Sequence, residues 1–365
     1  MASSDTTYSG SSSDRQLTDR EQEILRLVVK SFIDTAGPVG SRFLARTSGI
    51  ALSPASIRNT MSDLEGYGYL DHPYTSAGRV PTELGYRTFV DELMGSPRLS
   101  NLEKKILKGE LDRLMGDTSQ LLKESSRLLG RFSNLLGVVL TPKLSTGVLE
   151  RMEVVQLSSS RIMFVVSVKG GLVKTIVLEL ESDLDRRDLD RVVYILNERL
   201  AGLTLEEIRK TYPARVRDLR DDHSGIVRLI LKEGALLFSD PSENRRLQYA
   251  GAQNILLQPE FQEPADLHAL IAMLEDEDFV VHLLEDRREM KGDEPGRATI
   301  SIGREHVEEK AERYSIVTAD YQIGQTVGTV GIIGPTRMDY ERIIALVESI
   351  ATLLNRTDGV SEAGK

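Results

Sequence analysis

The sequence predicts an α+β protein of several domains, and three observations support this. Three short helical patterns followed by a hairpin pattern fill residues 17–95, which is the element order of a winged helix-turn-helix domain. Strand patterns lie at 136–180 and again at 298–333. A mostly helical stretch near 185–255 separates these strands, so we expect one α+β domain interrupted by an inserted domain.

Composition is that of an ordinary globular protein. The chain has 365 residues, of which 40% are hydrophobic and 28% are charged, enough for two or three domains. No apolar run is long enough to span a bilayer and the start lacks a signal-peptide pattern, so we expect a cytoplasmic protein without a membrane partner. Cysteine is absent, which excludes disulfides and thiolate chemistry.

The first domain begins after a Ser/Thr/Gly-rich tail, residues 1–16, that we expect to be disordered. A capping box formed by Thr18 and Glu21 starts the first helix, which ends at a Gly-Pro pair. We expect Ser41 to cap a second, short helix whose Phe43 and Leu44 pack inward.

The third helix, from Pro54 to about Glu65, is predicted to bind DNA. Ser53 is a suitable N-cap, and Pro54 suits the first helical position because its missing N–H would have no partner there. On a helical wheel three apolar residues, Ile57, Met61 and Leu64, fall on one side. The other side carries small residues that allow close approach, beside one arginine and one asparagine. Arginine and asparagine are the side chains that recognise guanine and adenine edges through paired hydrogen bonds.

A predicted two-stranded hairpin forms the wing, with strands at residues 69–70 and 79–80, before a further helix at 83–94. Ser41, Arg42 and Ser53 are expected to contact phosphates rather than bases. Arg79 is expected to enter the minor groove or pair with a phosphate, the alternative being a surface salt bridge. The complete predicted DNA-binding set is Ser41, Arg42, Ser53, Ala55, Ser56, Arg58, Asn59, Ser62 and Arg79.

The net charge of −10 does not exclude DNA binding, because the acidic residues lie mostly outside the predicted head. Residues 38–90 contain five basic and four acidic side chains, a local charge of +1. A near-neutral head on an acidic body should bind non-specific DNA weakly and depend on specific contacts and dimerisation.

The rest of the chain is predicted as linker helices at 96–135, an α+β core at 136–184 and 256–356, and an inserted domain at 185–255. Within the insertion a helix is expected at 226–237. The GPTRMDY motif from Gly334 to Tyr340 is interpreted as a structural turn rather than a ligand loop. Asn244, Arg245 and Arg246 are interpreted as an interdomain or dimer contact.

The sequence shows no group of residues in a pattern typical of a catalytic, metal or cofactor site. The five histidines are scattered without ligand spacing, and neither a phosphate-binding glycine loop nor a nucleophile–base pair is present, so we expect no metal, no cofactor and no enzyme activity.

Several long stretches resemble the HrcA family of heat-inducible transcription repressors. They are LTDREQEIL, GPVGSRFLA, LSPASIRNTMSDLEGYGYLDHPYTSAGRVPTELGYR, FVDELM, LLFSDPSENRRLQYAGAQNILLQPEF and SIVTADYQIGQTVGTVGIIGPTRMDYERII. The resemblance implies a winged helix, a GAF-like core and an inserted dimerisation domain. It also implies a homodimer that binds an inverted repeat, the CIRCE operator, upstream of chaperone genes, and whose activity depends on the chaperonin GroEL. The wing residues His72 and Tyr74 are not assigned to bases.

A second function remains open at this stage. The same DNA-binding head could serve a regulator that responds to a small molecule bound in the GAF-like core.

Overall fold

The computed structural model describes residues 16–73, 78–158, 161–179, 186–217, 232–234, 237–238, 246–290 and 296–355. The chain is a mixed α/β protein that divides into two compact units, residues 1–95 and 96–365. Within the described ranges, no helix has both the length and the apolar character needed to cross a membrane. Residues 1–15 of the predicted tail and most of the predicted helix at 226–237 lie outside the described residues.

The first unit contains the predicted helices and hairpin. Its elements are α1 (Asp19–Thr35), α2 (Ser41–Thr47), α3 (Pro54–Gly66), β1 (Leu70–Asp71), β2 (Val80–Pro81), α4 (Glu83–Thr88) and a π-helical turn, η1 (Phe89–Leu93). The predicted capping box starts α1: Thr18 N–H donates to the Glu21 carboxylate at 2.8 Å and Glu21 N–H donates to the Thr18 hydroxyl at 3.4 Å. Fully buried apolar residues of α1 and α3, such as Ile24 and Ile57, form the core of this unit.

The two wing strands are antiparallel, and the chain before α2 extends their ladder. Val39 and Arg79 exchange two backbone hydrogen bonds of 2.8 Å, which adds a short third strand to the hairpin. Gly78 makes this approach feasible, because a Cβ there would lie 2.4 Å from the Val39 backbone. Residues 74–77, which the sequence places in the predicted hairpin, lie outside the described residues.

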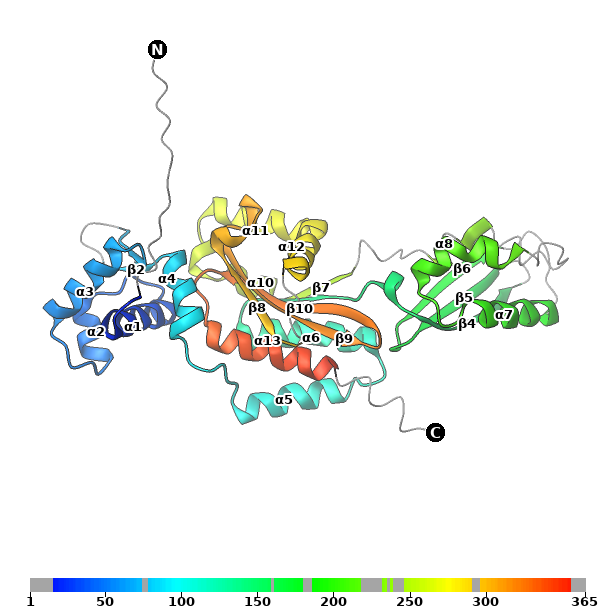
Figure 1. Cartoon of the computed structure of the whole chain (residues 1–365), viewed down its shortest axis with the longest axis horizontal. Coiled ribbons are helices and arrows are strands. Elements are labelled where there is room, and N and C mark those ends of the chain that lie inside the picture. Colours follow the sequence, from blue (N-terminus) through cyan, green and yellow to red (C-terminus); the bar gives the residue numbers. More distant parts are fainter. Residues whose placement is uncertain are drawn as a thin grey trace, which may run out of the picture. The chain divides into compact units, whose positions relative to one another are not determined.

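The second unit holds a five-stranded antiparallel sheet in the order β7-β3-β10-β9-β8 (Figure 1). Its strands are β3 (Leu136–Leu140), β7 (Leu247–Ala250), β8 (Ala298–Ile302), β9 (Tyr314–Ile323) and β10 (Thr326–Pro335). One face packs against α6 (Thr118–Ser133) and α13 (Tyr340–Asn355), with α5 (Asn101–Asp112) beside them. The other face packs against α10 (Ala252–Leu256), α11 (Pro264–Glu275) and α12 (Glu277–Met290).

The predicted linker helices at 96–135 are therefore only partly a linker. α6 covers the sheet so closely that a Cβ on Gly137 of β3 would lie 2.4 Å from the Ser126 carbonyl oxygen. The periodicity of α6 predicted a helix, but the packing partner of its apolar stripe is a tertiary feature that periodicity does not specify.

A second, separate sheet contains β4 (Leu149–Ser158), β5 (Arg161–Val168) and β6 (Val173–Glu179), in that order and antiparallel. Its inner face packs against α7 (Arg186–Leu200) and α8 (Leu205–Arg215) in one apolar core that includes Met152, Phe164 and Leu196.

This arrangement corrects the predicted partition of the chain. The strands at 149–179 do not join the C-terminal strands in one sheet, and they share their apolar core with α7 and α8 instead. Conversely, residues 247–250, predicted within the insertion, form β7 at the edge of the five-stranded sheet. Alternating hydrophobicity identified the β4–β6 strands, but it does not specify which sheet a strand joins. Here the helices that follow directly in sequence cover the sheet, as neighbouring elements usually do.

Candidate nucleic-acid interface

The helix α3 is built as the sequence predicted. The Ser53 hydroxyl accepts a hydrogen bond of 3.1 Å from Ser56 N–H, and Pro54 occupies the first turn. The apolar seam of Ile57, Met61 and Leu64 is buried, with exposed fractions of 0%, 3% and 0%. One side of the helix is thus fixed in the core, which determines the side that faces outward.

The outward side of α3 exposes Ser53, Ala55, Arg58, Asn59 and Ser62. Ser56 is only half-buried, and its carbonyl accepts a hydrogen bond of 2.8 Å from Arg20 at the start of α1. This hydrogen bond holds the first turn of α3 against α1. The arginine and the asparagine therefore project from a helix that is anchored along its length and at its N-terminus.

Helix α2 differs from the prediction in two details. Its N-cap residue is Gly40, and Ser41 lies in the first turn with an exposed fraction of 9%, so the Ser41 side chain is largely enclosed. Phe43 points outward, with an exposed fraction of 44%, whereas Leu44 is fully buried as expected. A seven-residue helix has one narrow buried stripe, and Ser41 and Leu44, three residues apart, occupy it.

Unpaired cations of the first unit gather on α2 and α3. Arg26 and Arg87 form ion pairs with Glu23 and Asp91, at 2.6 and 3.3 Å. Arg79 pairs with Glu65, Arg20 bonds the Ser56 carbonyl, and Lys30 is also engaged. Among the described residues of this unit, the remaining cations lack such partners and are exposed: they are Arg42, Arg46 and Arg58.

Arg46 was not in the predicted set. It lies one helical turn after Arg42, and this spacing puts both guanidinium groups on one side of α2. The four-residue spacing was visible in the sequence and could have identified it.

Arg79 lies at the base of the wing. Its Nη2 is 2.6 Å from a carboxylate oxygen of Glu65, and the two side chains are 24% and 21% exposed. The surface salt bridge considered as the alternative for Arg79 is thus present, so the structure brings Arg79 to Glu65 rather than into the exposed set.

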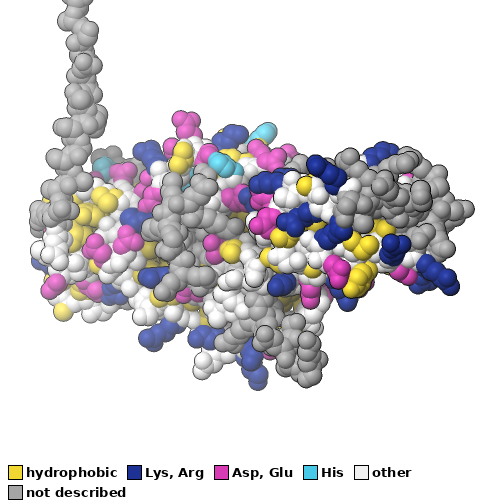
Figure 2. Space-filling view, turned by 45° about the vertical axis from the view of Figure 1, so that its right-hand side comes forward, with side chains coloured by type: hydrophobic (Ala, Val, Ile, Leu, Met, Phe, Trp, Pro, Cys, Tyr) yellow, Lys and Arg dark blue, Asp and Glu magenta, His cyan; other side chains and the backbone are white. Residues whose placement is uncertain are grey.

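The face of the molecule seen in Figure 2 carries side chains of both charges. Lys and Arg side chains there are interspersed with Asp and Glu side chains. An acidic chain with intermixed surface charge offers little attraction to DNA over a wide area.

The described arginines of the two motifs, Arg337 and Arg246, are bonded within the second unit, whereas Asn244 and Arg245 lie outside the described residues. Arg337, within GPTRMDY, forms two hydrogen bonds of 2.5 and 3.1 Å with Glu260, and Asp339 caps the Arg342 N–H at 3.2 Å. Arg246 has a 2% exposed side chain, pairs with Glu285 at 2.7 Å, and donates to the Thr141 carbonyl at 3.0 Å.

Glu285 shows the electrostatic consequence of this pairing. Burial disfavours its charged form, but hydrogen bonds from Arg246 and Lys143 together outweigh burial and hold the pKa of the Glu285 carboxyl below its usual range. This cluster ties β7 and the end of β3 to α12. The predicted interdomain or dimer role of Arg246 is not needed to explain its burial.

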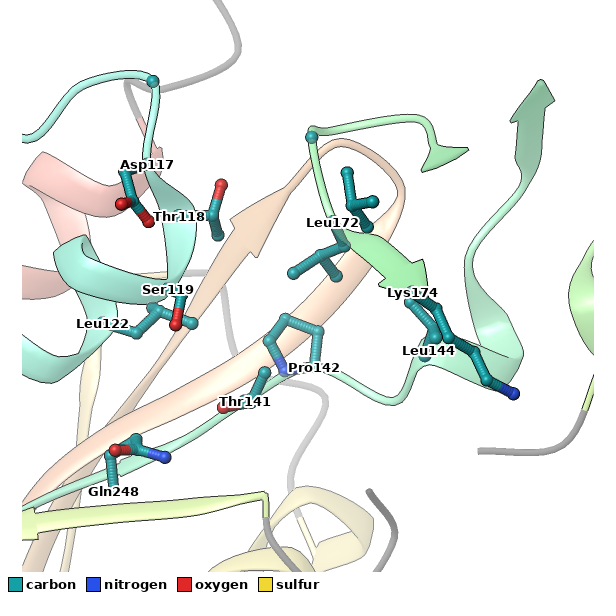
Figure 3. A pocket seen from close by; sticks show the side chains of 13 residues that line it. Asp117, Thr118, Ser119, Leu122, Thr141, Pro142, Leu144, Leu172, Lys174 and Gln248 are labelled. Carbon is teal, nitrogen blue, oxygen red and sulfur yellow. The ribbon is translucent and has the colours of Figure 1, made fainter. Parts of the chain in front are cut away.

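A pocket of about 550 Å³ lies in the second unit between the start of α6, the ends of β3 and β7, and the turn from β5 to β6 (Figure 3). Its lining includes Thr118, Ser119, Thr141 and Gln248 among apolar side chains. The Asp117 carboxylate caps Gln120 N–H at 3.0 Å, and the Lys174 ammonium donates to the Leu237 carbonyl at 3.1 Å. The described residues contain no group of acidic, histidine or cysteine side chains arranged to hold a metal ion.

Comparisons with known proteins give a consistent result. A model of the family described as "HrcA protein C terminal domain" matches residues 119–344. The chain is 46% identical to "Heat-inducible transcription repressor HrcA" of Chlorobaculum parvum, over 93% of this chain and 97% of that protein. It is 41% identical to the protein of the same name from Chlorobium luteolum, over 94% of this chain and 98% of that protein. A crystal structure titled as a hypothetical protein has the same fold, with a TM-score of 0.62 and 22% identity, covering 95% of this chain and all of that one.

Proposed function

The chain belongs to the HrcA family of heat-inducible transcription repressors, and on this premise we propose that it is a sequence-specific DNA-binding repressor of heat-shock genes. One observation carries the proposal: Arg58 and Asn59 stand exposed on a helix whose opposite side is buried, and the contacting helix α2 carries Arg42 and Arg46, which are exposed and have no ion-pair partner among the described residues. We take residues 17–95 as a winged helix-turn-helix domain. As a factor acting on bacterial genes, it would work in the cytoplasm.

In the proposed complex, α3 enters the major groove. Arg58 would donate two hydrogen bonds to a guanine edge, and Asn59 would pair with an adenine edge. Ala55 and Ser62 keep the surface low enough for these side chains to reach the bases. Arg42, Ser53 and Ser56 would contact the phosphate backbone and fix the register.

We propose that a homodimer binds a CIRCE-type inverted repeat and blocks RNA polymerase. The described residues of a single head offer three cations without an ion-pair partner, which neutralise few phosphates, so two linked heads are needed for useful affinity. The outer face of the β4–β6 sheet supports an interface with a second copy. Val155, Met163 and Val177 form one cross-strand row there, and Val155 and Val177 are 43% and 50% exposed.

The heat response is proposed to depend on the chaperonin GroEL, as the family resemblance implies. Chaperonin-assisted folding would maintain the population of competent dimer, and unfolded clients would divert the chaperonin during heat stress. Operator affinity measured against temperature, with and without GroEL, tests this step. Identical curves in both conditions would rule it out.

The central test is a titration of the full chain against a CIRCE inverted repeat and a scrambled copy of equal length, followed by fluorescence anisotropy. We expect the operator to bind at least a thousandfold tighter, as specific sites usually do. Equal affinities would disprove sequence-specific binding.

Analytical ultracentrifugation of Val177→Lys tests the dimer, since a charge in a buried sheet interface should yield monomers.

The pocket of Figure 3 favours one second candidate, a repressor that responds to a small molecule. Its cation and carboxylate are both satisfied within the protein, so an uncharged ligand with hydroxyl or amide groups fits best. The pocket lies beside the five-stranded sheet rather than within its core. A metabolite that raises the melting temperature and changes operator affinity, while GroEL has no effect, would favour this function.

A further inference from the structure

Glu65 connects the last turn of α3 to both sides of the wing. One carboxylate oxygen contacts the His72 imidazole, just after β1, and the other lies 2.6 Å from Nη2 of Arg79, just before β2. A single acidic side chain on α3 therefore meets the two chain segments between which the wing extends.

Among the described residues, Glu65 is the ion-pair partner of the Arg79 side chain. Its backbone is fixed by the two hydrogen bonds to Val39, and its Nε is buried with no hydrogen-bond acceptor. The guanidinium is thus held between the wing and α3 by the Glu65 carboxylate. A partly desolvated pair of this kind has a stronger and more directional attraction than a pair in open water.

From this geometry we propose that Glu65 is a positioning residue, which fixes the wing relative to α3 so that both can contact one DNA site. The inference rests on the proposed function, and it assigns Arg79 to holding the wing instead of contacting DNA. Loss of the Glu65 charge weakens its contacts with both sides of the wing base at once, while the backbone ladder remains. It also frees Arg79 to approach phosphates without regard to sequence.

The first test needs no DNA. The natural chain lacks cysteine, so Ser62→Cys on α3 and Pro73→Cys on the wing give two unique sites for spin labels. Both positions are exposed. Pulsed electron resonance would measure their separation in the full chain, diluted with unlabelled chain so that pairs within one molecule dominate.

We expect a narrow distance distribution in the parent and a broader one after Glu65→Gln. Arg79→Gln removes the same pair from the other side and should broaden the distribution as well, which guards against a folding defect in one variant. Asp34→Asn is the matched control, because it removes one negative charge from an exposed α1 residue that has no ion-pair partner among the described residues. Equal widths in Glu65→Gln and Asp34→Asn would overturn the proposal.

The second test uses DNA. Glu65→Gln should lower the preference for the operator over a scrambled copy roughly tenfold, the size expected when one charge-assisted hydrogen bond is lost. Its salt dependence on scrambled DNA should be steeper than that of Asp34→Asn by about 0.9 in log–log slope for each freed arginine. Parallel changes in the two variants would contradict the positioning role. A parent that lacks operator preference would refute the proposed function instead, and the label distances would still decide the role of Glu65.

Discussion

Arg58 of α3, compared with Arg337 and Arg246 of the second unit, shows how the same side chain takes two roles. Arg58 is exposed and has no ion-pair partner among the described residues. Arg337 and Arg246 have side chains that are 12% and 2% exposed, and each is bonded to a glutamate. All three lie in motifs that the sequence brings to attention. A carboxylate within reach, rather than the motif, therefore decides whether an arginine stabilises the fold or is available to a partner.

The physical basis of this comparison is solvation. A buried guanidinium must be paired, because removing its partner leaves an uncompensated charge away from water. An exposed guanidinium keeps its hydration and its donors, so it can exchange water for a phosphate or a guanine edge. Substitutions of the buried arginines should therefore lower stability, whereas substitutions of the exposed arginine should lower DNA binding.

The largest expected effect is on stability. Arg246→Ala leaves Glu285, whose side chain is 27% exposed, with Lys143 as its remaining cation partner in the described cluster. We expect the free energy of unfolding to fall by roughly 3 kcal/mol. Urea titration followed by far-UV circular dichroism measures this, since the chain contains no tryptophan. Arg58→Ala, the control, should leave the unfolding midpoint unchanged. Similar midpoints for both variants would contradict the claim that the buried arginine stabilises the fold and the exposed one does not.

The next effect is on specificity. Arg58→Ala should cost about 1–3 kcal/mol of discrimination at the base that it contacts in each half-site, while the fold stays intact. Arg58→Lys keeps the charge but not the paired donors, so affinity for scrambled DNA should persist while the operator preference falls. A gel-shift titration with both DNAs measures these quantities. Unchanged operator preference in Arg58→Ala would show that α3 does not recognise bases through this side chain.

Features that depend on residues close together in the sequence are predictable from it, whereas features that depend on contacts between distant segments are not. The cap at Ser53 and the buried seam of α3 follow from local spacing, and both are confirmed. The sheet that β4–β6 form on their own, and the place of β7 beside β3, depend on pairings between distant segments, which periodicity does not encode. The ion pair of Arg79 with Glu65 joins residues fourteen apart through the turn of the wing, so the sequence left a salt bridge and a DNA contact both open.

A smaller effect, on DNA affinity, is expected at Arg46, which is exposed like Arg58 but lies on α2. Arg46→Ala should weaken operator and scrambled DNA by the same few-fold factor, because a phosphate contact carries no sequence information. The slope of log affinity against log salt should become shallower by about 0.9 for each head. A variant that changes only operator affinity would show that Arg46 contacts a base.

The smallest expected effect is on the pH dependence of stability, which should differ between variants of the buried Arg246 and variants of the exposed Arg58. The pKa of the Glu285 carboxyl is held below its usual value of 4.5, because the hydrogen bonds from Arg246 and Lys143 outweigh burial. A carboxyl with a lowered folded-state pKa stabilises the fold above its unfolded-state pKa, and this stabilisation is lost as pH falls through the folded-state value. Unfolding free energy should therefore decrease on acidification below about pH 4.5, and the decrease should be shallower in Arg246→Ala and Glu285→Gln. Arg58→Ala should follow the parent curve, because among the described residues the Arg58 guanidinium has no carboxylate partner whose titration could be linked to folding. A shallower acid dependence in Arg58→Ala than in the parent would mean that the exposed arginine also stabilises the fold through a carboxylate, contrary to the division between the two sets.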